Sequence, residues 1–110
     1  MTHLADPKMQ ECVDACNQCY QMCLHGAMNH CLESGGEHVK PDHFRLMMNC
    51  AEICQTSVNF MLSSSVFSRQ VCRVCAEVCE ACASHCEKVG MNDCAKTCRE
   101  CAGTCREMAA

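Results

Sequence analysis

The stretch CRVCAEVCEACASHC, residues 72–86, decides the fold of this chain, because its five cysteines follow one another at steps of 3, 4, 3 and 4. Side chains at this spacing share one face of an α-helix, so the stretch predicts a helix with a single stripe of thiols. Polar side chains repeat with the same period on the opposite face: Arg73, Glu77, Glu80, Ser84 and Glu87. The buried face of this helix is therefore expected to be sulfur instead of hydrocarbon.

The composition of the whole chain gives cysteine the role that aliphatic residues usually have. Among 110 residues there are 16 cysteines, whereas Leu, Ile, Val and Phe together number only 17. Such a low aliphatic content is typical of disordered chains, but the net charge of −4 and the strong periodicity argue against disorder. We expect a single domain, residues 1–110, whose cysteines fill the core and whose stability depends in part on what the thiols bind.

Charge and hydropathy argue against several classes of function. The mild negative charge and the lack of Lys/Arg clusters argue against nucleic-acid binding. No apolar run approaches the ~18 residues of a membrane span. The N-terminal MTHLADPKMQEC lacks the basic and apolar segments of a secretory signal, so we expect the reducing cytoplasm, where cysteines are metal ligands more often than disulfides. No Ser/His/Asp set or carboxylate pair stands out, so we expect no enzymatic activity.

The remaining sequence predicts three more helices with the same kind of stripe. These three helices are expected over residues 6–33, 41–62 and 92–108. The central helix is expected to start near Ser65 or Ser68 and to stop before Gly90. Asp6 and Asn92 are the expected N-caps of the first and last helices. Four amphipathic helices with short connections predict an all-α, up-down antiparallel four-helix bundle with a cysteine-lined core.

Fourteen of the cysteines form seven pairs separated by one helical turn: Cys12/Cys16, Cys19/Cys23, Cys50/Cys54, Cys75/Cys79, Cys82/Cys86, Cys94/Cys98 and Cys101/Cys105. Only Cys31 and Cys72 lie outside these pairs. At this spacing the β-carbons are roughly 5–6 Å apart, beyond the roughly 3.5–4.5 Å of a disulfide. Ordinary rotamers can bring the sulfurs to about 4.5 Å, twice a metal–sulfur bond, so the pairs favour a two-coordinate soft ion.

Cu(I) is the ion that this pattern favours. Cysteine and methionine select it, whereas zinc prefers four tetrahedral ligands, and a continuous stripe does not divide naturally into closed sets of four. Buried thiolates also need counterions, so on the order of 16 Cu(I) ions per chain are expected, and about half that number of divalent zinc ions.

The cysteine arrays resemble those of the four-helix-bundle copper storage proteins of bacteria, and the lack of a signal sequence resembles their cytosolic branch. The resemblance covers nearly the whole chain and depends on the arrays at residues 12–23, 72–86 and 94–105. It implies a tetramer of bundles whose cores bind Cu(I) through cysteine thiolates. That role extends to Cys50 and Cys54 on the second helix.

One end of such a bundle gathers residues 24–48 and 84–94, and the other end an expected apolar plug: Phe60, Leu62, Val66, Phe67 and Val71. We hypothesise that copper enters at the first end, through side chains that bind it more weakly than thiolates do. The candidate ligands there are His30, His43, Met28, Met47 and Met91. The family resemblance supports an open end with His or Met, although Met47 also suits a packing role in the core. His3, His25 and His38 are expected to be solvated, and His85 to lie beside the stripe.

Three alternative functions stay open at this point. Four Cys-x2-Cys steps suggest an iron–sulfur electron carrier, although the tight loop and following proline of ferredoxins are missing. A helical structural protein stapled by disulfides would show no free thiols without reductant. A zinc buffer would differ from a copper store in its loading stoichiometry.

Overall fold

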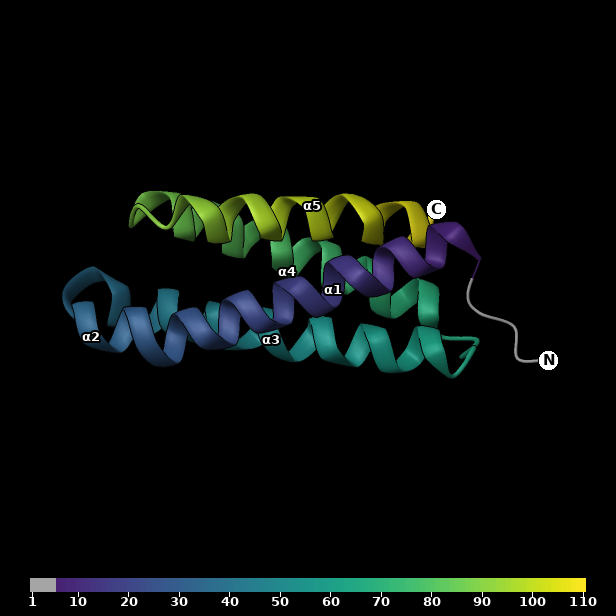
Figure 1. The fold of residues 1–110 in the computed structure, drawn as a ribbon, viewed down its shortest axis with the longest axis horizontal. Helices are drawn as coiled ribbons and strands as arrows, with labels where there is room; N and C mark the ends of the chain where they lie inside the picture. Colours follow the sequence, from purple (N-terminus) through teal and green to yellow (C-terminus); the bar gives the residue numbers. More distant parts are fainter. Residues whose placement is uncertain (1–5) are drawn as a thin grey trace.

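The computed structural model describes residues 6–110, which form four antiparallel helical rods (Figure 1). The first rod is α1 (Pro7–His25), continued by the π-helical η1 (Gly26–Cys31) and the short α2 (Leu32–Ser34); a 3-10 segment, η2 (Gly36–Val39), follows it. The other rods are α3 (Pro41–Leu62), α4 (Ser68–Lys88) and α5 (Asn92–Ala109). The rods contact one another in a closed ring, α1–α3–α4–α5–α1, which confirms the predicted up-down bundle.

The helix starts follow local sequence only in part. Asp6 caps α1 as predicted, because its Oδ1 accepts a hydrogen bond from the Met9 backbone N at 3.0 Å. Asn92 does not act as the expected cap: it already lies inside α5, and Met91 occupies the cap position without a side-chain hydrogen bond. Among residues 6–110, none of the helices combines the length and the apolar character that crossing a bilayer requires.

The first rod changes its winding where the cysteine spacing becomes irregular. Cys23 and Cys31 are eight residues apart, which in a regular α-helix would rotate Cys31 about 80° away from the stripe. The π-helix Gly26–Cys31 turns less per residue. Cys31 is fully buried as a result, and it extends the sulfur stripe toward the end of the bundle.

The core is made mainly of thiols, together with alanines, two valines and two methionines, Met47 and Met61. All sixteen cysteines are between 0 and 4% exposed. Four alanines are buried on the two helices that contact each other most, α4 and α5: Ala76, Ala83, Ala95 and Ala102. On the outer side of this contact, Arg99 and Arg106 form ion pairs with Glu80, and Arg99 also with Glu87. The close approach of the two helices therefore depends on alanine, with exposed ion pairs worth about 0–1 kcal/mol each.

The expected apolar plug is wrong for three of its five members, whereas Phe60 and Val71 are half-buried. Leu62, Val66 and Phe67 are 60, 84 and 59% exposed, because they flank or lie in the turn between α3 and α4. The interior at this end, called the closed end below, is filled instead by Met61 and Ser57, both 0% exposed.

Candidate metal centre

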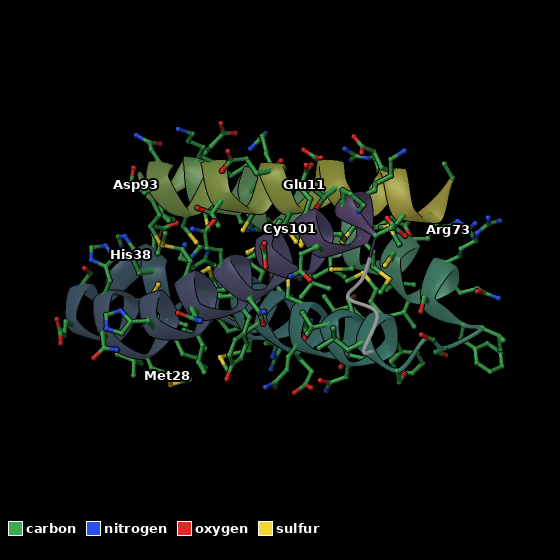
Figure 2. All side chains as sticks on the ribbon, turned by 45° about the vertical axis from the view of Figure 1, so that its right-hand side comes forward. Glu11, Met28, His38, Arg73, Asp93 and Cys101 are labelled. Atoms are coloured by element: carbon green, nitrogen blue, oxygen red, sulfur yellow. The ribbon has the colours of Figure 1, made fainter. Side chains whose placement is uncertain are left out.

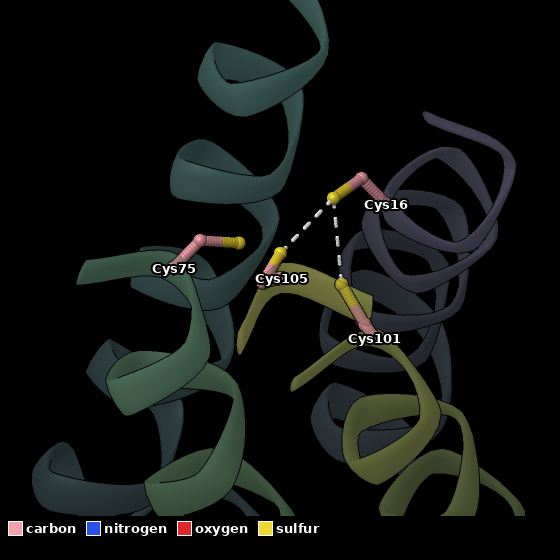
Figure 3. A group of neighbouring side chains, drawn as sticks. All are labelled: Cys16, Cys75, Cys101 and Cys105. Atoms are coloured by element: carbon pink, nitrogen blue, oxygen red, sulfur yellow. Dashed lines mark hydrogen bonds between the residues drawn. The ribbon is translucent and has the colours of Figure 1, made fainter. Parts of the chain in front are cut away.

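Thiols from all four rods meet along the bundle axis. Twelve of them are joined by Sγ–Sγ contacts of 3.5 to 4.0 Å into one continuous column. Figure 3 shows one part of it, in which Cys16 lies 3.6 Å from Cys105 and 3.5 Å from Cys101, with Cys75 facing them. The members are Cys12, Cys16, Cys19, Cys23, Cys50, Cys54, Cys75, Cys79, Cys94, Cys98, Cys101 and Cys105.

The shortest contacts run mostly between helices, a feature that the stripes along single helices do not predict. Four of the expected pairs along single helices also have their sulfurs within 4.8 Å of one another: Cys19/Cys23, Cys50/Cys54, Cys75/Cys79 and Cys101/Cys105. Among the contacts up to 4.0 Å in residues 6–110, one joins two cysteines of the same helix, Cys75 and Cys79, at 3.8 Å. The others join different helices, as Cys54 and Cys79 do at 3.5 Å. The physical reason is that each thiol points to the axis, where sulfur atoms from neighbouring helices are as near as those one turn away.

The thiols also form sets of four, but these sets overlap and share members, so the column does not divide into separate closed sites. Within residues 6–110, four sets have all their sulfur atoms within 4.8 Å of one another, and each set draws on three helices. They are group A (Cys16, Cys75, Cys101, Cys105), group B (Cys19, Cys50, Cys54, Cys79), group C (Cys19, Cys23, Cys50, Cys98) and group D (Cys54, Cys75, Cys79, Cys101). A fifth set has three members, Cys12, Cys72 and Cys105.

The interior provides no positive charge to balance thiolates. The buried polar side chains of residues 6–110 are His43 and Ser57, and none of the buried residues is Lys or Arg. Burial raises the pKa of the Cys31 thiol, with further contributions from nearby Cys94 and Cys82. The pKa of Cys54 is also raised, because its thiol hydrogen-bonds to Cys101 and other sulfurs and is buried. Without ions these two thiols are therefore neutral, and a cation must be present before their thiolates form.

At the end formed by η1, η2 and the start of α3, here called the histidine end, thiols meet other ligand types. His43 is 2% exposed, and its Nε2 lies 3.8 Å from Cys31 Sγ. Cys31 Sγ donates to Met91 Sδ at 3.6 Å, and Met47 Sδ accepts from Cys86 Sγ at 3.4 Å. The structure thus brings three predicted candidates, His43, Met47 and Met91, together with thiols.

Four imidazoles form a series at the histidine end. The ring centroids of His30 and His38 are 5.0 Å apart, those of His38 and His43 6.4 Å, and those of His43 and His85 6.3 Å. Burial lowers the pKa of His43, so at neutral pH its ring is uncharged and able to bind a cation. The sequence analysis expected His38 to be solvated and His85 to lie beside the stripe. It did not place their rings near His43, because those positions depend on the fold of η2 and on the packing of α4 against α3.

Met28 does not join these residues. Its side chain is 42% exposed on the outer side of the first rod, away from the sulfur-lined interior (Figure 2). It lines a surface groove with Tyr20, Met22 and Leu24. His30 is also exposed, but its ring contacts that of His38 and so remains part of the histidine series.

Comparison with known proteins gives consistent matches. The sequence profile of a family described as copper storage protein (Csp) matches residues 5–110. A solved structure from Nitrosospira multiformis is 65% identical and covers 96% of this chain and 97% of that chain, with a TM-score of 0.93. The Cu(I)-bound copper storage protein BsCsp3 is 38% identical, with 94% and 99% coverage and a TM-score of 0.86. An uncharacterized cysteine-rich protein of Bacillus subtilis (strain 168) is 38% identical over 68 residues, 62% of each sequence.

Proposed function

The chain belongs to the copper storage protein family, and from this premise we propose that it holds on the order of 16 Cu(I) ions in its own core. The proposed ligands are the thiolates of all sixteen cysteines. The column of twelve thiols supplies most of them, and the remaining four are Cys31, Cys72, Cys82 and Cys86. The ions are the cargo of the protein, and we propose no catalytic role for it.

The observation that carries the proposal is that the described part of the chain buries sixteen thiols and no Lys or Arg. Sixteen thiolates without cations would be strongly unfavourable in an interior of low dielectric constant. One monovalent ion for each thiolate leaves the interior near neutrality, whereas a smaller load of Cu(I) leaves thiols protonated. Sulfur contacts of 3.5 to 4.0 Å along the axis allow each sulfur to bridge neighbouring ions.

Two of the alternative functions lose support. Disulfide staples do not fit a chain in which all sixteen cysteines of residues 6–110 are free thiols. An iron–sulfur carrier does not fit a sulfur column that continues over the length of the core. Family membership favours copper storage over both.

Copper is proposed to enter at the histidine end. An ion meeting the exposed His30 and the half-buried His38 would pass to the neutral ring of His43, which contacts Cys31. Imidazole and thioether bind Cu(I) less firmly than thiolate does, so ligand strength increases from the surface to the core. Met47 lies one step further in, beside Cys86.

We further propose that the protein acts in the cytoplasm and as a homo-oligomer, in line with the tetramer implied by the sequence resemblance. The groove lined by Tyr20, Met22, Leu24 and Met28 supports self-association, because it exposes apolar side chains on one face of the first rod. Light scattering coupled to gel filtration tests the oligomeric state directly.

Anaerobic Cu(I) titration of the fully reduced chain against a competing chelator tests the storage function. The proposal expects the chelator to stay copper-free until on the order of 16 ions per chain have bound. Saturation after a handful of ions would contradict it.

A further inference from the structure

We propose that the copper-free core is also a binding site for divalent tetrahedral ions of the Zn(II) class, and that it holds two of them per chain. The capacity follows from how groups A to D share their thiols. The proposal does not depend on copper storage, because it concerns the reduced chain before any Cu(I) has bound.

The distances between the thiols fit a tetrahedral ion. A metal–sulfur bond near 2.3 Å gives a tetrahedral S–S edge of about 3.8 Å, whereas linear coordination requires about 4.6 Å. In group D, Cys54 lies 3.8 Å from Cys75, 3.5 Å from Cys79 and 3.8 Å from Cys101. Four edges of group C measure 3.6, 3.7, 3.6 and 4.0 Å. Both groups are therefore close to the geometry of a tetrathiolate site before an ion arrives.

Shared thiols limit how many groups can be filled at once. Groups A and D share Cys75 and Cys101, groups B and C share Cys19 and Cys50, and groups B and D share Cys54 and Cys79. The pairs without a common thiol are A with B, A with C, and C with D. No three groups are independent, so two four-coordinate ions are the maximum.

Charge and coordination number argue against a third ion. Each site forms when four thiols bind one divalent ion and release four protons, which leaves a net charge of −2 in an interior without Lys or Arg. The set Cys12, Cys72 and Cys105 supplies only three thiols, one fewer than a closed zinc site uses. Cu(I) is limited neither by charge, because one ion balances one thiolate, nor by a need for four ligands. The expected capacity for Cu(I) is therefore much larger than that for Zn(II).

Because the groups share thiols, the capacity for divalent ions should depend on which single cysteine is replaced. Cys50→Ser removes groups B and C, and the remaining groups A and D share thiols, so the capacity falls to one. Cys54→Ser, one turn further along the same helix, removes groups B and D, but A and C remain independent, so the capacity stays at two. Cys19→Ser and Cys23→Ser on α1 form a second matched pair, with expected capacities of one and two.

The test is titration of the reduced, metal-free chain with Zn(II), followed by native mass spectrometry, and with ¹¹³Cd(II), followed by NMR of the bound cadmium. The original chain, Cys54→Ser and Cys23→Ser should bind two ions with the chemical shift of a tetrathiolate site, and Cys50→Ser and Cys19→Ser should bind one. Circular dichroism and a Cu(I) titration of each variant serve as controls, and both the fold and the copper capacity should be equal within each pair. Equal divalent capacities within either pair, a third tetrathiolate ion, or no stable ion would overturn the proposal while leaving copper storage untouched.

Discussion

Replacing Met47 with leucine tests whether a buried thioether takes part in copper transfer from the histidine end. Met47 is 0% exposed, and its Sδ accepts from Cys86 at 3.4 Å and from Cys82 at 3.7 Å. Leucine keeps the volume, so the change should cost less than about 1.5 kcal/mol of folding free energy, against about 2–5 kcal/mol for alanine. All thiols remain, so the copper capacity should not change. Loading should slow about tenfold if the thioether lowers the barrier by about 1.4 kcal/mol.

Met61→Leu is the matched control. Met61 is also 0% exposed and lies on the same helix, but fourteen residues further along, about 21 Å from Met47 and at the closed end. Rapid anaerobic mixing of the reduced chain with a coloured Cu(I)–chelator complex gives the loading rate of each variant. Slow loading of Met47→Leu alone is expected. Equal rates for the two variants would refute a role for Met47 in the transfer.

Three further predictions follow from burial. Burial lowers the pKa of His43 below 6.5, so the unfolded chain binds a proton at this residue more readily than the folded chain does. In urea unfolding, stability should therefore fall as the pH drops below about 6.5, by at most about 1.4 kcal/mol per pH unit. His43→Gln should remove this pH-dependent part of the stability. Loading in weak buffer should release about one proton per Cu(I), because thiols buried without a buried Lys or Arg in residues 6–110 are expected to keep their protons until copper enters. A release of far fewer protons would show that thiolates form without copper. Ala102→Leu should lower the free energy of unfolding in urea by about 1–3 kcal/mol, since Ala102 is 0% exposed. Ala81→Leu, on the outer face of α4, should change this free energy little. Equal losses of stability in the two variants would contradict the alanine contact between α4 and α5.

The fold could be predicted because the features that determine it, helical periodicity and helix breaks, can be recognised along the sequence itself. The cysteine stripes repeat with the period of an α-helix, and the breaks at Gly35 and Ser63 mark the ends of the first two rods within a residue or two. The expected ranges 6–33 and 41–62 accordingly lie close to the observed rods, and Asp6 caps the first of them. The burial of the cysteines other than Cys31 follows from the same periodicity.

The arrangement of the thiols could not be predicted, because it depends on how the helices are placed against one another. Spacing along a helix predicts pairs such as Cys50 and Cys54, and their sulfurs lie within 4.8 Å of one another. It cannot show that the sulfur of Cys79, on another helix, lies closer to Cys54, at 3.5 Å. The π-helix that turns Cys31 inward has no distinctive sequence signal. The same applies to η2, which brings His38 to the ring of His43.

A crystal structure of the Cu(I)-saturated chain, with anomalous scattering measured at the copper edge, tests the central claim most directly. The account predicts copper peaks along the whole axis, from the set Cys12, Cys72 and Cys105 at the closed end to Cys31 at the histidine end. Peaks confined to the histidine end or to the outer surface, with the thiols of groups A to D left without metal, would contradict it.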